Sequence, residues 1–240
     1  SSDLASEADI VINTADADDI FATMAFLDAL KGTGKTFINT SGTSLLSRRS
    51  VGQLDSFIYD ESFPFKPDIE RAERDLLNKH VQSASRFNIR TIVIVPSMVY
   101  GMGLGIKKQS AQVPEIEKIS EMKKAGVYIE EGANVWSNVH IADLAELYVL
   151  ALEYAAPGSI YYAENGEASL RDIATAVSKK IGFGGHTISL SIQEAIEIWG
   201  PEFSYYGLSS NSRVSSEKAR RSLQWSPQYN SITDSIENNY

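Results

Sequence analysis

A turn rich in hydroxyl side chains offers the first candidate chemistry in this sequence. Ser41, Thr43 and Ser44 follow the β-branched run 35–40, and each hydroxyl can donate and accept a hydrogen bond. Small hydroxyl residues are also common where strands end, so the same turn supports a purely structural interpretation. Tyr100 adds a phenol just beyond another apolar run, and a phenol can transfer a proton or simply pack at a junction.

His140 and Asp143 are three residues apart, a spacing that can present two ligands to a metal ion. Zinc sites need three or four protein ligands, and the sequence offers no third candidate, so we expect no metal site. We expect Asp143 to cap the apolar helix that follows it, and His140 to anchor a junction between two parts of the molecule. Because the 240 residues include no cysteine, a thiol nucleophile and a disulfide are excluded.

Composition narrows the classes of partner. The formal net charge of −9 argues against a protein that binds nucleic-acid phosphates, which needs clustered Lys and Arg. No apolar run approaches the roughly 20 residues that cross a bilayer, and the polar, acidic start does not resemble a secretory signal. We therefore expect a cytoplasmic protein that acts on a small molecule, with neither a nucleic-acid nor a membrane partner.

Short β-branched runs alternate with helical patterns in the first hundred residues. Runs of this kind are typical of strands that are buried on both faces of a parallel sheet. An aspartate at 16 or 18 is the expected cap of the first helix. The order and spacing predict right-handed crossovers and an α/β fold with a doubly wound parallel sheet. Strands are expected over 8–15, 35–40 and 90–95, and helices over 16–30 and 68–87.

After Pro96 the pattern changes to glycine-rich loops, short strands and several helices. We expect residues 1–100 to form the remainder of a dinucleotide-binding, Rossmann-like domain, and residues 101–240 to form mainly a smaller substrate-binding lobe. Residues near 135–165 are expected to return to the main sheet. Trp199 and Trp225 are expected in the core of the lobe, and the polar tail from Asn230 is expected to fray.

Five motifs, in order along the chain, resemble the extended short-chain dehydrogenase/reductases, which include the NAD-dependent epimerases and dehydratases. Each motif alone is weakly specific, but together they span nearly the whole chain. They are Ala8 to Ala15, Phe37 to Thr43, Ile94-Val95-Pro96-Ser97-Met98-Val99-Tyr100-Gly101, Val139-His140-Ile141-Ala142-Asp143-Leu144-Ala145, and Lys218 to Pro227 with its Leu-Gln-Trp-Ser-Pro end.

The resemblance implies roles for specific residues and implies NAD or NADP as the cofactor. Catalytic hydrogen bonds to the reacting oxygen would come from Ser41 and Thr43. The residues implied at the cofactor are Thr14, Ala15, Thr40, Arg74, Pro96, Ser97 and Met98, and those implied at the substrate are Tyr100, Trp136 and Asn138.

The chain departs from the family pattern at the phosphate-binding segment. The family begins with a strand and a G-x-x-G-x-x-G turn that binds the pyrophosphate, and these residues contain no such turn after a first strand. One half-fold, roughly 70 residues, would be needed to supply it. We expect the segment to exist in the biological protein, and the strand at 9–14 to present an apolar edge without it.

A second departure concerns the family's Tyr-x-x-x-Lys pair, which precedes the strand at 90–95. Counting back from Pro96 puts Glu70 at the tyrosine position and Arg74 at the lysine position. Arg74 is always charged and can hold a ribose or phosphate, whereas a glutamate is ionised at neutral pH unless burial raises its pKa. Glu70 and Arg74 therefore join the catalytic candidates, although the usual proton transfer is not supported.

Two functions follow from these observations. The first is an NAD(P)-dependent oxidoreductase or epimerase-like enzyme acting on a small carbonyl, alcohol or sugar-type substrate. The alternative, favoured by the replaced Tyr/Lys pair, is a non-catalytic NAD(P)-sensing regulatory or binding protein. The resemblance also implies a homodimer that pairs the helices expected at 16–30 and 68–87.

Overall fold

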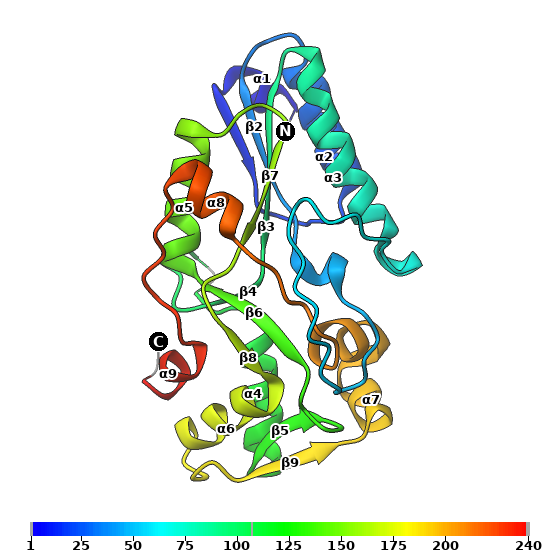
Figure 1. Ribbon diagram of the computed structural model, residues 1–240, viewed down its shortest axis with the longest axis vertical. Helices are drawn as coiled ribbons and strands as arrows, with labels where there is room; N and C mark the ends of the chain where they lie inside the picture. The colour runs from blue at the N-terminus through cyan, green and yellow to red at the C-terminus, as the bar shows by residue number, and fades with distance from the viewer. Residues whose placement is uncertain (1, 107, 239–240) are drawn as a thin grey trace.

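A parallel four-stranded sheet forms one half of the molecule in the computed structural model, which describes residues 2–106 and 108–238 (Figure 1). Its register places Thr40 beside Ile94 and Pro96 beside Ala163, so the carboxyl ends of adjacent strands meet at one edge. The expected α/β fold with a parallel sheet is confirmed. The strand order is β1 (Ile10–Asn13), β2 (Thr36–Thr40), β3 (Arg90–Pro96) and β7 (Ser159–Ala163).

Helices cover both faces of this sheet (Figure 1). Phe37 and Val93 pack towards one face, while their chain neighbours Ile38 and Ile92 pack towards the other, and all four are fully buried. This burial on both faces explains why the strands have unbroken β-branched sequences. One face carries α2 (Ile20–Leu30) and α3 (Ala72–Ala84), and the other carries α5 (Ile141–Tyr154) and α8 (Glu217–Leu223).

Strand β1 lies at the open edge of the described sheet. Ile10 and Ile12 are 41% and 46% exposed there, which is the apolar edge that the sequence predicted. The short helix α1 (Ser2–Glu7) packs against α2 nearby.

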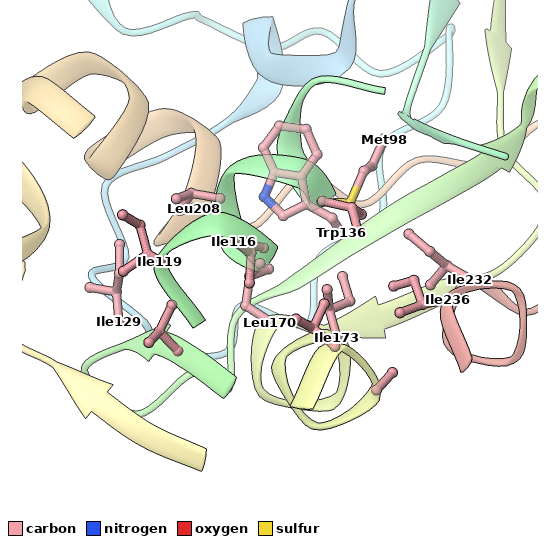
Figure 2. Close-up of a cluster of buried hydrophobic side chains, with 14 of the residues drawn as sticks. Met98, Ile116, Ile119, Ile129, Trp136, Leu170, Ile173, Leu208, Ile232 and Ile236 are labelled. Atoms are coloured by element: carbon pink, nitrogen blue, oxygen red, sulfur yellow. The ribbon is translucent and has the colours of Figure 1, made fainter. Parts of the chain in front are cut away.

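Smaller sheets and helices form the other half, which we call the lobe (Figure 1). One sheet pairs β4 (Met98–Tyr100) with β6 (Val135–His140), and β6 with β8 (Glu167–Ser169); the second pairs β5 (Gly126–Ile129) with β9 (Thr187–Leu190). Figure 2 shows the lobe's apolar core, in which Met98 and Trp136 meet isoleucine and leucine side chains from the surrounding elements. The lobe helices are α4 (Gln112–Lys123), α6 (Leu170–Lys180), α7 (Ile192–Glu202) and α9 (Ile232–Glu237).

Four short helical turns complete the described chain. Two of them flank α3, so the helix expected over 68–87 is interrupted at both ends but keeps its overall course. They are η1 (Thr43–Leu46), η2 (Ile69–Arg71), η3 (Ser85–Phe87) and the π-helical turn η4 (Phe203–Leu208).

Several local expectations were wrong. Helix α2 begins at Ile20, and Asp19, rather than Asp16 or Asp18, caps it by accepting a hydrogen bond from the Ala22 amide at 2.8 Å. The tail beyond Asn230 forms α9, because Ile232 and Ile236 are buried in the lobe core. Residues 239–240, at the end of that tail, lie outside the described residues.

Asp143 is not a helix cap. His140 caps α5 instead, because its Nδ1 accepts a hydrogen bond from the Ala142 amide at 3.2 Å. The buried Asp143 carboxylate accepts hydrogen bonds from the backbone amides of Gln228 and Tyr229, both at 2.9 Å. Asp143 therefore binds the C-terminal segment to the start of α5, and no local sequence pattern predicts this tertiary contact.

Trp225 was expected in the lobe core but packs against the sheet. Its ring is 2% exposed among the side chains of the α5 face, and its Nε1 donates to the Asp143 carbonyl at 2.9 Å. His140 does lie at a junction, as expected: its ring stacks on Tyr229 at 4.0 Å between centroids and meets the edge of Tyr100 at 5.2 Å.

Gly101 shows why a glycine follows Tyr100 at this junction. Its φ is +93°, and a Cβ at this position would lie 2.3 Å from His140 Nε2. No other residue combines that backbone conformation with so close an approach to an imidazole.

Candidate functional site

A cavity of about 510 Å³ lies between the carboxyl ends of β2 and β3 and the lobe. In open parallel sheets, ligands bind at this edge, and the volume is within the range of small-molecule sites. Its walls are the turn Gly42–Ser44, the start of α3, the end of β3, and a lobe face from Trp199 to Gly207. The lining also includes Ala111, Gln112 and Trp136.

Five of the residues predicted from the sequence line this cavity: Thr43, Arg74, Pro96, Ser97 and Trp136. Thr43 is 1% exposed, and its Oγ1 has no hydrogen-bond partner among the described residues. Ser97 is held rigidly, because its backbone amide and its hydroxyl both donate to the Ala163 carbonyl, at 3.0 and 2.8 Å. Trp136 Nε1 donates to the Ser210 carbonyl at 2.9 Å, which fixes the indole in the wall.

Arg74 crosslinks two loops at the mouth of the sheet. Its Nε donates to Asp18 at 2.7 Å, its Nη2 pairs with the same carboxylate, and its Nη1 donates to the Ser44 hydroxyl. The hydrogen bond from Arg74 lowers the pKa of Asp18. Arg74 is therefore present at the cavity, with all three of its side-chain nitrogens already engaged.

Glu70 does not line the cavity. Its carboxylate pairs with Arg49, and both side chains are largely exposed, at 42% and 48%. A hydrogen bond from its own backbone amide lowers the pKa of Glu70, and the nearby Tyr206 hydroxyl and Arg49 charge lower it further. The structure thus places at this position an exposed, ionised carboxylate that pairs with Arg49 and does not line the cavity.

Three further candidates lie in the lobe core rather than in the cavity wall. Tyr100 is fully buried, its hydroxyl donates to the Tyr229 carbonyl at 3.1 Å, and burial raises its pKa. Met98 is 1% exposed and packs within the core that Figure 2 shows. Asn138 is also 1% exposed, and neither of its side-chain amide atoms has a hydrogen-bond partner among the described residues.

The remaining candidates surround the sheet edge outside the cavity. The Ser41 hydroxyl accepts a hydrogen bond from Asn78 at 2.9 Å, and Thr40 Oγ1 lies 2.6 Å from the Tyr148 hydroxyl. Thr14 and Ala15 are exposed just beyond β1. Of the two predicted catalytic hydroxyls, Thr43 lines the cavity and Ser41 does not.

Sequence reasoning missed Arg71, Trp199 and Tyr206, which all line the cavity. The Arg71 side chain is 7% exposed, and its guanidinium lies 4.5 Å from the centre of the Tyr206 ring and pairs with Glu202 at 3.1 Å. Burial raises the pKa of Tyr206. Arg71 precedes Arg74 by one helical turn, and that spacing indicates two cations on one helix face. No sequence pattern places Trp199 and Tyr206 at the cavity, because they belong to segments far from Arg71 along the chain.

Two other features are absent from the described residues. No group of three His, Cys, Asp or Glu side chains is gathered there as metal ligands would be. Within residues 2–106 and 108–238, no helix is both long and apolar enough to span a membrane.

Comparison with known proteins places this geometry in a wider context. No protein-family model matches the chain. An uncharacterized protein of Saccharomyces cerevisiae is 29% identical over 221 residues, which cover 91% of this chain and 68% of that protein. An uncharacterized protein of Schizosaccharomyces pombe is 32% identical over 206 residues, which cover 85% of this chain and 64% of that protein. The chain thus spans about two thirds of the length of these relatives.

Solved structures resemble the whole described fold. UDP-glucose 4-epimerase from Thermotoga maritima, crystallised with UDP-glucose, superposes with a TM-score of 0.75 at 14% identity, over 98% of this chain and 79% of the epimerase. A dTDP-glucose 4,6-dehydratase from Bacillus anthracis, crystallised with NAD, gives 0.74 at 14% identity, over 97% of this chain and 71% of the dehydratase. Both the sheet and the lobe are shared, so the resemblance inferred from the motifs is confirmed at the level of architecture. This chain has the Rossmann-like α/β fold of the NAD-dependent epimerases and dehydratases.

Proposed function

We propose that the chain is the substrate-side part of an NAD(P)-dependent oxidoreductase or epimerase-like enzyme that acts on a small carbonyl, alcohol or sugar-type substrate. The observation that carries the proposal is the cavity at the carboxyl ends of β2 and β3, where Thr43 presents a buried hydroxyl without a protein partner. The neighbouring structures crystallised with NAD support the same cofactor class.

The residues at this edge fit the nicotinamide end of such a cofactor. Pro96 and Ser97 end β3 at the cavity and offer a rigid surface, and Thr43 offers a hydroxyl to the reacting oxygen of a substrate. Arg74 holds the Ser44 turn in place and adds positive charge near the ribose position that the resemblance implies. When bound, the nicotinamide supplies the hydride acceptor or donor, while these residues orient the substrate and exclude water.

The test is titration of NADH and NADPH into the full-length protein, followed by cofactor fluorescence, and then turnover on a panel of carbonyl substrates. We expect saturable binding of one cofactor. Thr43→Val, which removes the hydroxyl at nearly constant volume, should lower kcat by ~10²-fold or more while changing cofactor affinity less than about threefold. Absence of binding by either cofactor would overturn the proposal.

The non-catalytic sensor remains a second candidate because of one observation. Glu70, at the expected tyrosine position, faces Arg49 outside the cavity, and no Tyr-x-x-x-Lys occurs between Asp55 and Arg90. Cofactor binding without turnover on any carbonyl substrate, combined with a cofactor-dependent change in bound proteins, would favour the sensor.

Homodimerisation through α2 and α3 is also part of the proposal. Phe21 and Leu76 expose apolar side chains on these helices, 89% and 64% accessible, which a pairing of helices would bury. Sedimentation of the wild type and of Phe21→Glu tests it: we expect a dimer that the charge dissociates, and a monomeric wild type would contradict it.

A further inference from the structure

Three residues of the cavity wall carry buried donor groups that no described protein atom satisfies. Thr43 Oγ1, Arg71 Nε and Trp199 Nε1 all belong to lining residues, and none has a hydrogen-bond partner among the described residues. The arginine and indole nitrogens can only donate, and the threonine hydroxyl can donate too. A buried donor without an acceptor is costly, so three in one wall point to an acceptor-rich occupant.

The two arginines of the wall differ in the hydrogen-bond donors that remain without a protein partner. Arg74 gives Nε and Nη2 to Asp18 and Nη1 to Ser44, so its donors are engaged within the protein. Arg71 gives Nη1 to Glu202 and stacks on Tyr206, while its Nε has no partner. Arg71 is therefore the guanidinium of this wall with donor capacity for a ligand.

The positive charge available to a ligand in this wall comes from Arg71, because Asp18 already pairs with Arg74. The described lining residues of the wall include the guanidiniums of Arg71 and Arg74 but a single carboxylate, Glu202. The Glu202 side chain is 75% exposed, so its hold on Arg71 is screened by water and can yield to a ligand. Trp136, Trp199 and Phe203 provide aromatic surface for the uncharged part of the same molecule.

We propose that the substrate carries an oxyanionic group, a carboxylate or a phosphate, which binds to Arg71 with Thr43 and Trp199 as further donors. This inference rests on the proposed function, because it takes the cavity to be the substrate end of the enzyme. Arg71 acts as a specificity-determining residue: its planar fork matches the two oxygens of a carboxylate or a phosphate.

The probes are three molecules that share one ring: benzoate, phenyl phosphate and neutral benzamide. Each is titrated calorimetrically into the full-length protein, with and without saturating NADH or NADPH. We expect at least one of the two anions to bind ~10-fold or more tightly than benzamide, and the better anion identifies the group as carboxylate or phosphate. Equal affinity for all three probes would overturn the proposal.

Variants assign the preference to Arg71. Arg71→Gln should bring the preferred anion to within about twofold of benzamide, whereas Arg86→Gln, in η3 beyond the far end of α3, should keep the wild-type preference. A folded Arg71→Gln protein, checked by circular dichroism, that keeps the preference contradicts the assignment.

A second variant remains informative even where loss of the buried Arg71 prevents folding. Glu202→Gln removes the exposed carboxylate that competes for Arg71, so the affinity for the preferred anion should rise ~3-fold or more. A purely structural Arg71 predicts no such gain, and an unchanged or weaker affinity overturns the proposal.

The two proposals fail in different ways. If neither NADH nor NADPH binds while the Arg71-dependent preference persists, the cofactor assignment fails and the oxyanion site stands. If a cofactor binds but the anions show no preference over benzamide, the oxyanion site alone fails. If the cofactor displaces the preferred anion competitively, Arg71 serves the cofactor and the substrate assignment is overturned.

Discussion

The central sheet and the lobe both have a buried apolar core, but some of their strands are buried to very different extents. Strands β2 and β3 bury nearly every side chain, and apolar residues on both faces meet the covering helices. In the lobe, β8 has no fully buried residue and β9 buries one, while side chains bond to distant backbone. Asn134, for example, donates to the carbonyls of Leu208 and Ser210, and Trp136 donates to Ser210 as well.

This difference bears on how the site is built. The sheet supplies an edge whose position is fixed by apolar burial, whereas the opposite wall combines the apolar core of the lobe with polar ties to distant backbone. Ser212 joins the two directly, since its hydroxyl donates to the Thr43 carbonyl at 2.9 Å. Loss of apolar burial at the sheet should therefore reduce the free energy of unfolding most. Loss of one of the polar hydrogen bonds should mainly make the lobe wall of the cavity more mobile.

Trp225→Ala should produce the largest effect. The ring is 2% exposed against the sheet, so its removal opens a cavity and leaves the Asp143 carbonyl without its donor. We expect a loss of ~3–5 kcal/mol in the free energy of unfolding, measured by urea denaturation. Trp199→Ala, the same change at a partly exposed lobe position, should cost about 1–2 kcal/mol; equal losses would contradict the comparison.

Asp143→Asn tests the polar tie between α5, which covers the sheet, and the C-terminal segment that leads into the lobe. Each carboxylate oxygen accepts one backbone amide of the C-terminal segment, and asparagine keeps one acceptor while turning an NH₂ towards the other amide. We expect a loss of ~1–3 kcal/mol in unfolding free energy and faster amide exchange at 228 and 229. Asp28→Asn, at an exposed position of α2, is the control and should cost less than about 0.5 kcal/mol.

The same contrast explains what the sequence could predict. The sheet was accessible because runs such as 90–95 encode burial on both faces locally, and the motifs gave the order of the strands. Arg71, Trp199 and Tyr206 were not predicted, because their place in the wall depends on packing between η2, α7 and η4. Asp143 was wrongly predicted to cap α5. An acidic residue in the first turn of a helix gives the same local sequence pattern whether it caps that helix or accepts hydrogen bonds from a segment more than 80 residues away.

Acid should weaken the junction at His140. Burial is the main cause that lowers its pKa below the ordinary 6.5, although Asp143 opposes the shift. At a pH between the His140 pKa of the folded protein and that of the unfolded chain, the unfolded chain binds more protons. The stabilisation that neutral His140 gives the folded state above pH 6.5 is therefore lost as the pH falls through the folded-state pKa. Protonation also removes the Nδ1 acceptor and places a positive charge at the start of α5.

The measurement compares unfolding free energies at about pH 7.5 and about pH 5 for the wild type and His140→Asn. Asparagine can cap the helix but does not titrate, so the wild type should lose ~0.3–1 kcal/mol more than the variant on acidification. Identical pH dependence in the two proteins would show that His140 is not the titrating group at this junction.

Glu70→Gln should have the smallest effect on stability and gives a clear answer about the sequence hypothesis. The Glu70–Arg49 pair is exposed on both sides, so its loss should change the unfolding free energy by less than about 1 kcal/mol. Because the carboxylate pairs with Arg49 and does not line the cavity, its neutralisation should leave turnover within ~3-fold of that of Glu73→Gln, an exposed neighbour on α3. A loss of ~10²-fold or more at unchanged stability would instead support the acid/base role that position 70 has in the family alignment, and would require Glu70 to turn into the cavity during catalysis.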